Sequence, residues 1–358
     1  MTRRAYSLIE FALALAIAGI VTTAALSLYA SLVRSFSDMR KRTYADDNAK
    51  TVVAYLGREL RRAGGYTLRP WQAIAVDDQT STTCNSDGLP PCQGSDRLTL
   101  AFPVEQRATG CALSNPQGDS SSASYQSGTI DGVCCFTWFR GGVGPNITSQ
   151  QVILTHGPFS RAAVITAVDT SQCRATLVPS AQGAPLTLGT AALHQFGGGA
   201  LVHVDLATYY RGCADDECVP DERSTHSLLM WLDRNATSAA ATINDDEVFL
   251  VAPLLFDLQI ALGYDARNRD GVIHESETED EDDELLFNHR GVDTLAALKD
   301  EIDVDLRVAK IVAVSGVRQS NPREQSIQVL NAEVLVGRGI HFSRFEATAA
   351  LRNLGIFQ

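Results

Sequence analysis

The sequence lacks the cysteine spacing that marks a zinc site or a dithiol redox centre. It has eight cysteines among 358 residues, and no two of them form a C-x-x-C pair. Structural zinc sites and thioredoxin-like redox pairs typically use that spacing. An even number of cysteines without it indicates disulfides, which form and persist in an oxidising compartment.

The chain also lacks an excess of positive charge. Its 30 lysines and arginines are outnumbered by 42 aspartates and glutamates, which gives a formal net charge of −12 at pH 7. Such a chain repels phosphate backbones, so we expect no nucleic-acid partner. Hydrophobic residues make up 45% and charged residues 20% of the sequence, which excludes a wholly disordered or collagen-like chain.

Sequence motifs for catalysis are missing as well. The seven histidines form no H-E-x-x-H pair, and there is no G-x-S-x-G elbow and no Walker loop. The glycines at 141–142 and 197–199 stand beside no lysine and no helix start, so we interpret them as turns. His203 and Asp205 share one face of a predicted strand, where a hydrogen-bonded polar pair is a better interpretation than catalysis. We therefore predict that the protein is not an enzyme.

Charge and proline are both missing from Phe11 to Val33, a run of 23 residues. As an α-helix this run would be about 34 Å long, enough to cross the hydrocarbon core of a membrane. Basic residues lie on both sides of the run, so their count does not decide its orientation. A secretory signal peptide fits less well, because the run is long and no small-residue cleavage region follows it.

Glu10 stands at the start of this apolar run. A carboxylate in that position is costly in lipid unless it is paired with an opposite charge. A plain membrane anchor gives no reason for such an acid, whereas a helix that must meet a cationic group within the membrane does. Glu10 is therefore the first candidate functional residue.

The predicted helix continues beyond the apolar run. Residues 34–56 contain no glycine or proline, and apolar residues recur at steps of three and four: Ala45, Ala49, Val52, Leu56, Leu60 and Ala63. This spacing gives one apolar face, which we interpret as core packing against a soluble domain. Gly64 and Gly65 mark the end of the helix. Gly57 lies inside it and costs about 1 kcal/mol of helix propensity relative to alanine.

The remainder of the chain, residues 65–358, is predicted to form one β-rich domain. Runs of β-branched and aliphatic residues alternate there with turn-rich segments. The predicted strands are Arg97–Pro103, Cys135–Phe139, Val152–Thr155, Ala163–Val168, Leu201–Tyr210, Ser227–Leu232, Val248–Leu262, Val304–Val314 and Phe342–Leu351. Pro253 is predicted to break its strand, and Gln79–Ser95 and Ser114–Gly128 are predicted to be polar loops. The sequence leaves open whether residues 70–240, approximately, form an inserted subdomain.

Residues Ala5-Tyr-Ser-Leu-Ile-Glu10 resemble the processing motif of type IV pilins and type II secretion pseudopilins. In that family a membrane peptidase cuts a short basic leader before an aromatic residue and methylates the new N-terminus. The resemblance implies a leader at 1–5, cleavage between Ala5 and Tyr6, and pairing of Glu10 with the terminal amine of a neighbouring subunit during assembly. Ala5 and Tyr6 stand where the family usually has glycine and phenylalanine.

The resemblance extends along most of the chain. The leucine- and arginine-rich segment 55–66 is similar to the helix end of PilW-like minor pilins and of J-type minor pseudopilins. Segments 206–212, 227–229, 258–265 and 347–354 follow in the order seen in PilW-like proteins.

This resemblance implies an α+β fold of the type IV pilin kind. A long N-terminal helix, with a transmembrane or filament-core half (6–33) and an amphipathic half (34–64), would pack on an antiparallel β-sheet domain with large disulfide-bearing loops. The expected location is a single span of the inner membrane with a periplasmic domain, and then the pilus at the cell surface.

The function implied is that of a minor pilin, a structural protein that takes part in pilus initiation or in a tip complex. The expected partners are other minor and major pilins, the prepilin peptidase and the inner-membrane assembly platform. Two alternatives stay open. They are a minor pseudopilin of type II secretion and a membrane-anchored adhesin or calcium-binding protein.

Eight cysteines allow up to four disulfides, and the sequence alone does not fix their pairing. The simplest pairing joins the cysteines closest along the chain and leaves the vicinal pair to bond the two others in either order: Cys84–Cys92, Cys213–Cys218, and Cys134 and Cys135 with Cys111 and Cys173.

An acidic stretch between residues 265 and 284 is the candidate cation site. Its spacing partly follows a calcium-binding loop, but position one would be Ala266, which cannot ligate. The candidate calcium ligands are therefore Asp265, Asn268, Asp270 and Glu277. The alternative is a solvated acidic loop, because eight carboxylates fall within residues 275–284 and repel one another. We expect no other cofactor.

Overall fold

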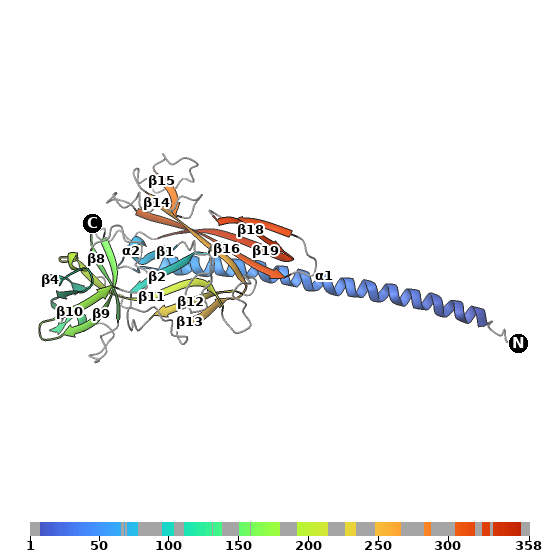
Figure 1. Ribbon diagram of the computed structural model, residues 1–358, viewed down its shortest axis with the longest axis horizontal. Coiled ribbons are helices and arrows are strands. Elements are labelled where there is room, and N and C mark those ends of the chain that lie inside the picture. The colour runs from blue at the N-terminus through green and yellow to red at the C-terminus, as the bar shows by residue number, and fades with distance from the viewer. Residues whose placement is uncertain are drawn as a thin grey trace.

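A single helix of 55 residues, α1 (Leu8–Arg62), runs from the N-terminal end of the molecule into a β-rich body (Figure 1). The computed structural model describes residues 8–65, 68, 70–77, 95–103, 111–130, 132–137, 150–157, 159–179, 192–213, 226–233, 248–265, 283–287, 305–318, 324–329 and 332–351. The layout is α+β, with one long apolar N-terminal helix followed by antiparallel sheets and two disulfides.

The C-terminal half of α1 packs inside the body. Five of the six residues on the predicted apolar face are no more than 1% exposed, and Ala63 is partly buried. The helix ends where the sequence predicts, because Gly64 and Gly65 adopt φ values of 76° and 52°, a region that favours glycine. The Gly64 N–H then donates to the Ala101 carbonyl at 2.9 Å, which fixes the helix end to strand β2 (Arg97–Pro103).

The first sheet has eleven strands, paired antiparallel along the order β1-β2-β11-β8-β9-β10-β5-β4. The long strand β11 also pairs with β12 and β3, and β13 pairs with β12. Besides β2, the strands are β1 (Ile74–Asp77), β3 (Cys111–Ala112), β4 (Ser114–Gly118), β5 (Ala123–Gln126), β8 (Gln150–His156), β9 (Phe159–Asp169), β10 (Arg174–Pro179), β11 (Ala200–Gly212), β12 (Ser227–Asp233) and β13 (Val248–Ala252).

The second sheet has four strands in the order β15-β14-β16-β19, and its strands β16 and β19 pack on α1. Its members are β14 (Leu255–Asp265), β15 (Asp283–Phe287), β16 (Asp305–Arg318) and β19 (Ile340–Ala350). The remaining elements are the hairpins β6 (Thr129–Ile130) with β7 (Val133–Cys134) and β17 (Glu324–Val329) with β18 (Ala332–Arg338), and the short helices α2 (Pro70–Ala73), η1 (Cys135–Thr137) and η2 (Leu193–Gln195).

Two main cores divide the body. The larger joins the packed half of α1 to both sheets, and includes Leu56, Leu60, Leu100, Leu206 and Ile311. The second lies at the end of the first sheet farthest from the N-terminus (Figure 1), and its residues come from the part of the chain that runs from β3 to the early part of β11. All strands of the first sheet except β13 come from the region 70–240, and β1, β2, β11 and β12 share a core with α1 and the second sheet.

Most predicted strands are confirmed, and Val248–Leu262 does break near Pro253 into β13 and β14. Two predictions are wrong. Residues 135–137 form the short helix η1 rather than a strand. The segment Ser114–Gly128, predicted to be a loop, contains β4 and β5, because Ala123 and Tyr125 alternate into the second core and β5 pairs with β10.

Candidate assembly surface

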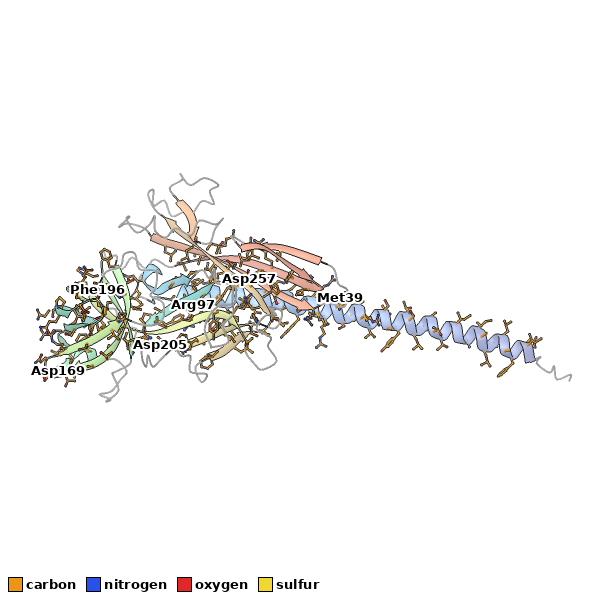
Figure 2. The ribbon with its side chains drawn as sticks, viewed as in Figure 1. Met39, Arg97, Asp169, Phe196, Asp205 and Asp257 are labelled. Carbon is orange, nitrogen blue, oxygen red and sulfur yellow. A yellow bond between two sulfur atoms is a disulfide. The ribbon has the colours of Figure 1, made fainter. Side chains whose placement is uncertain are left out.

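The N-terminal half of α1 projects from the body into solvent. Between Ile9 and Val33 its large apolar side chains are 48–78% exposed, and they point outward on several sides of the helix (Figure 2). Burial begins only at Ala45. Such an apolar surface is stable only when something covers it, since its exposure to water is unfavourable.

By length and composition, this helix is suited to cross a membrane, and within the described part of the chain it is the one helix of that kind. Two polar side chains within the apolar stretch are hydrogen-bonded to the helix itself. The hydroxyls of Thr22 and Thr23 donate to the carbonyls of Ala18 and Gly19 at 2.7 and 2.8 Å. Backbone-satisfied hydroxyls of this kind are tolerated in hydrocarbon, so these two threonines do not disqualify the span.

Glu10 lies in the first turn of α1, at the end of the helix most distant from the body. An acidic side chain there is favoured by the positive end of the helix dipole. The residue is exposed. Ala5 and Tyr6, the residues of the predicted cleavage site, lie outside the described residues.

An aromatic and ionic cluster lies at the packed end of α1. The Glu59 carboxylate accepts from Arg58 at 3.0 Å and from Arg62 at 3.1 Å. The Tyr55 ring meets the Tyr209 ring edge-on at 5.9 Å between centroids, and Arg58 lies 5.2 Å from the centre of the Tyr55 ring. Burial raises the pKa of Tyr209 far above its ordinary value. Of these contacts, the one between the Tyr55 and Tyr209 rings joins the helix to β11.

Two buried polar groups that the sequence did not single out join the two sheets. Arg211 of β11 is fully buried and donates to the Phe256 carbonyl of β14 at 2.6 Å. The Asp96 carboxylate, just before β2, accepts from the Ile260 N–H at 2.6 Å. His203 is also buried in β11, and Asp205 is half-buried. A fully buried arginine has no local sequence signal, because only the fold makes its position interior.

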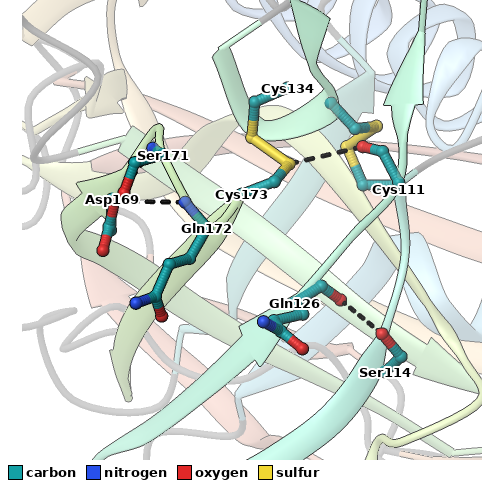
Figure 3. Close-up of a disulfide and its surroundings, with 10 residues drawn as sticks. Cys111, Ser114, Gln126, Cys134, Asp169, Ser171, Gln172 and Cys173 are labelled. Carbon is teal, nitrogen blue, oxygen red and sulfur yellow. Dashed lines mark hydrogen bonds between the residues drawn. A yellow bond between two sulfur atoms is a disulfide. The ribbon is translucent and has the colours of Figure 1, made fainter.

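Two disulfides cross-link the second core (Figure 3). They join Cys111 to Cys135 and Cys134 to Cys173. The vicinal cysteines thus bond to the two partners expected from the sequence, and the structure supplies the order. Cys213 is also disulfide-bonded.

Three of the cysteines, namely Cys84, Cys92 and Cys218, lie outside the described residues, and so the two pairings predicted for them stay predictions.

The β9–β10 hairpin beside the second disulfide is closed by Asp169. Its carboxylate accepts from the backbone N–H groups of Ser171 and Gln172 at 2.9 and 3.2 Å (Figure 3). Together with the Ser171 hydroxyl, these donors lower the pKa of Asp169. Cys173, with φ of 46°, then takes the left-handed position that a glycine usually fills in such a loop.

The candidate calcium ligands Asn268, Asp270 and Glu277 lie outside the described residues. Asp265 is described as the last residue of β14, where the backbone register sets it opposite Asp283 of β15 and Asp305 of β16. Among the residues that the structure describes, no group of three histidine, cysteine or acidic side chains is placed to hold a metal ion.

Comparisons of the chain with protein-family models, with curated proteins and with solved structures find no match.

Proposed function

We propose that this chain is a PilW-like minor pilin, a structural protein that takes part in starting a type IV pilus or in its tip complex. It is made as a prepilin, cut before Tyr6 and held in the inner membrane by residues 11–33 until assembly. Its partners are other minor and major pilins, the prepilin peptidase and the assembly platform.

One observation carries the proposal, namely the division of α1 into two halves with different surroundings. The half from Ile9 to Tyr44 projects from the body and has an acid, Glu10, directly before its apolar run of 23 residues, whereas the half from Ala45 on is packed in the body. A helix that only anchored a domain would need the apolar half but not Glu10. A helix that moves from lipid into contact with neighbouring helices would need both the apolar half and Glu10.

In the proposed mechanism the apolar half of α1 moves from lipid into the core of a filament. Glu10 then neutralises the terminal amine of a neighbouring subunit, because two opposite charges in an apolar medium are tolerable only together. The body, held at the far end of the helix, contacts other minor pilins. The two disulfides suit a domain that works outside the reducing cytoplasm.

The decisive experiment replaces Glu10 by alanine in the native host and uses Asp47→Ala as the matched control. Asp47 is an exposed acid on the same helix but lies within its body-side half. We expect Glu10→Ala to reduce surface pili at least tenfold, and Asp47→Ala to leave them unchanged, with both variants still found in the membrane. The tenfold figure corresponds to the loss of roughly 1.4 kcal/mol or more from one buried charge pair.

The N-terminal peptide mass of each protein is measured in the same samples. A chain that begins at N-methyl-Tyr6 supports prepilin processing. Normal pili with Glu10→Ala would contradict the assembly role, and an uncut chain that retains residues 1–5 would favour the anchored adhesin instead. Intact pili together with lost exoprotein secretion would identify a minor pseudopilin.

A further inference from the structure

A group of cations lies on α1 where the helix leaves its apolar run. The basic collar consists of Arg34, Arg40, Lys41 and Arg42, and all four side chains are exposed. It lies between Val33, the last residue of the apolar run, and Ala45, the first buried residue of the body-side half. With Asp38 as the single acid between residues 34 and 44, this part of the helix has a net charge of +3.

The cations of the collar point in different directions around the helix. Successive residues of an α-helix are turned by about 100°, so Arg40, Lys41 and Arg42 alone cover about 200° of the circumference, and Arg34 lies near Lys41 in direction. A protein partner that docked on this helix would meet one face of it. A charged layer that surrounds the helix would meet every cation of the collar.

The position of the collar along the helix matches the surface of a membrane. It spans about 12 Å of helix and begins directly after an apolar run long enough to cross the hydrocarbon core. Two large exposed side chains, Phe36 and Met39, lie among the cations, and a third, Tyr44, follows them by two residues. Aromatic rings interleaved with long basic side chains are typical of the region where lipid headgroups meet water.

We propose that the basic collar binds anionic phospholipid headgroups and so fixes the depth of α1 in the membrane before assembly. This inference rests on the membrane-inserted form of the proposed function. The charge is complementary to anionic lipids, and the surface adjoins the apolar run continuously. The cations of the collar exchange these headgroups for other surroundings when the helix enters a filament.

The experiment measures lipid selectivity on the full-length protein reconstituted in phosphatidylcholine vesicles. Spin-labelled phosphatidylglycerol or spin-labelled phosphatidylcholine is added as the probe, and the protein-restricted fraction of each is read from its spectrum. We expect a preference of about threefold or more for phosphatidylglycerol at low salt, because each basic residue near the surface attracts an anionic lipid severalfold. The preference should fall at high salt.

The test variant is Arg40→Gln with Lys41→Gln, and the matched control is Lys50→Gln with Arg61→Gln. Both variants lose two exposed cations from α1, but the control pair lies within the body-side half of the helix. We expect the test variant to show nearly equal restriction of the two lipids and the control to keep the wild-type preference. Arg42 is left in place because it lies near His341 of the body.

Three results would overturn the inference: no lipid preference in the wild type, an unchanged preference in the test variant, or an equal loss in the control variant. A chain that does not insert into the vesicles at all contradicts the membrane-spanning premise, and with it the proposed function. Insertion without lipid selectivity contradicts only the role of the collar.

Discussion

The pKa of His341 is shifted by burial and by charged residues of α1, near the point where the helix enters the body. The residue is half-buried near the start of β19. Burial lowers the pKa of its imidazole, the positive charge of Arg42 lowers it further, and Asp46 partly opposes the change. The neutral form is therefore favoured in the folded protein.

From this lowered pKa we predict that the body loses stability as the pH falls below about 6.5. The unfolded chain binds a proton on this histidine near pH 6.5 whereas the folded chain resists it, so acid favours unfolding. His341→Gln should show a smaller drop in unfolding temperature between pH 7.5 and pH 5 than the wild type. Circular dichroism in detergent measures it, with the exposed His156→Gln as control. Equal pH dependence in the wild type and the His341 variant would refute the assignment.

Sequence reasoning missed those residues whose surroundings are formed by segments distant along the chain. Glu10 stands out in a sequence because its apolar neighbours are adjacent to it along the chain. Arg211 does not, because the carbonyl that it donates to belongs to Phe256 of β14, 45 residues further along the chain. The order of the disulfides was likewise open, since it depends on which hairpins come together around Cys134 and Cys135.

At the scale of elements, α1 is continuous through Gly57 although this glycine weakens it. A Cβ added at Gly57 would meet the Ile311 side chain at 3.8 Å, an ordinary contact. At Gly64 the same atom would lie 2.7 Å from the Leu68 carbonyl oxygen, and the φ of 76° is strained for any other residue.

We therefore predict opposite effects of the same substitution at two positions of the helix. Gly57→Ala should stabilise the folded protein by about 0.5–1 kcal/mol through helix propensity. Gly64→Ala should destabilise it by about 1–3 kcal/mol, because alanine is strained in the left-handed region. Denaturant unfolding of both variants in detergent measures the two changes. A destabilised Gly57→Ala protein would mean that the packing against β16 has no room for a methyl group.

Elements were predictable from the sequence where their periodicity is local and long. The packed half of α1 repeats its apolar residues over five turns, and strands such as β11 and β16 are long and apolar. Strands β4 and β5 carry mostly polar residues, and all of β4 is exposed. Strand β5 pairs with β10, about 50 residues away, and β4 pairs in turn with β5, which no local pattern reveals.

At the scale of the whole molecule, the two cores differ in how they are held together. The larger core has a helix between two sheets, whereas the second core depends on disulfides that close loops of 24 and 39 residues. In the chain-entropy account such loops contribute about 3–4 kcal/mol each. The second core should therefore fail first when its cross-links are removed.

We predict that the double substitution Cys134→Ala with Cys173→Ala unfolds residues 111–179 selectively at a moderate temperature. Hydrogen exchange measured by mass spectrometry should show lost protection in this region and retained protection in the packed half of α1. Leu56→Ala provides the reciprocal control, since it leaves a cavity in the larger core and costs about 2–5 kcal/mol there. Simultaneous loss of protection in both regions would show that the body unfolds as one unit.

Because α1 is unbroken from Glu10 to the body, the orientation of Glu10 about the helix axis is coupled to the orientation of the body. A rigid helix transmits rotation. The angle about the helix axis between Glu10 and each sheet of the body is therefore fixed. Inserting one residue between Arg34 and Tyr44 would rotate the body by about 100° about the helix axis and move it about 1.5 Å along that axis relative to Glu10. Inserting seven residues would nearly restore the original orientation. If the proposed pairing of Glu10 with a neighbouring amine takes place, the continuous helix would fix which side of the body faces that neighbour.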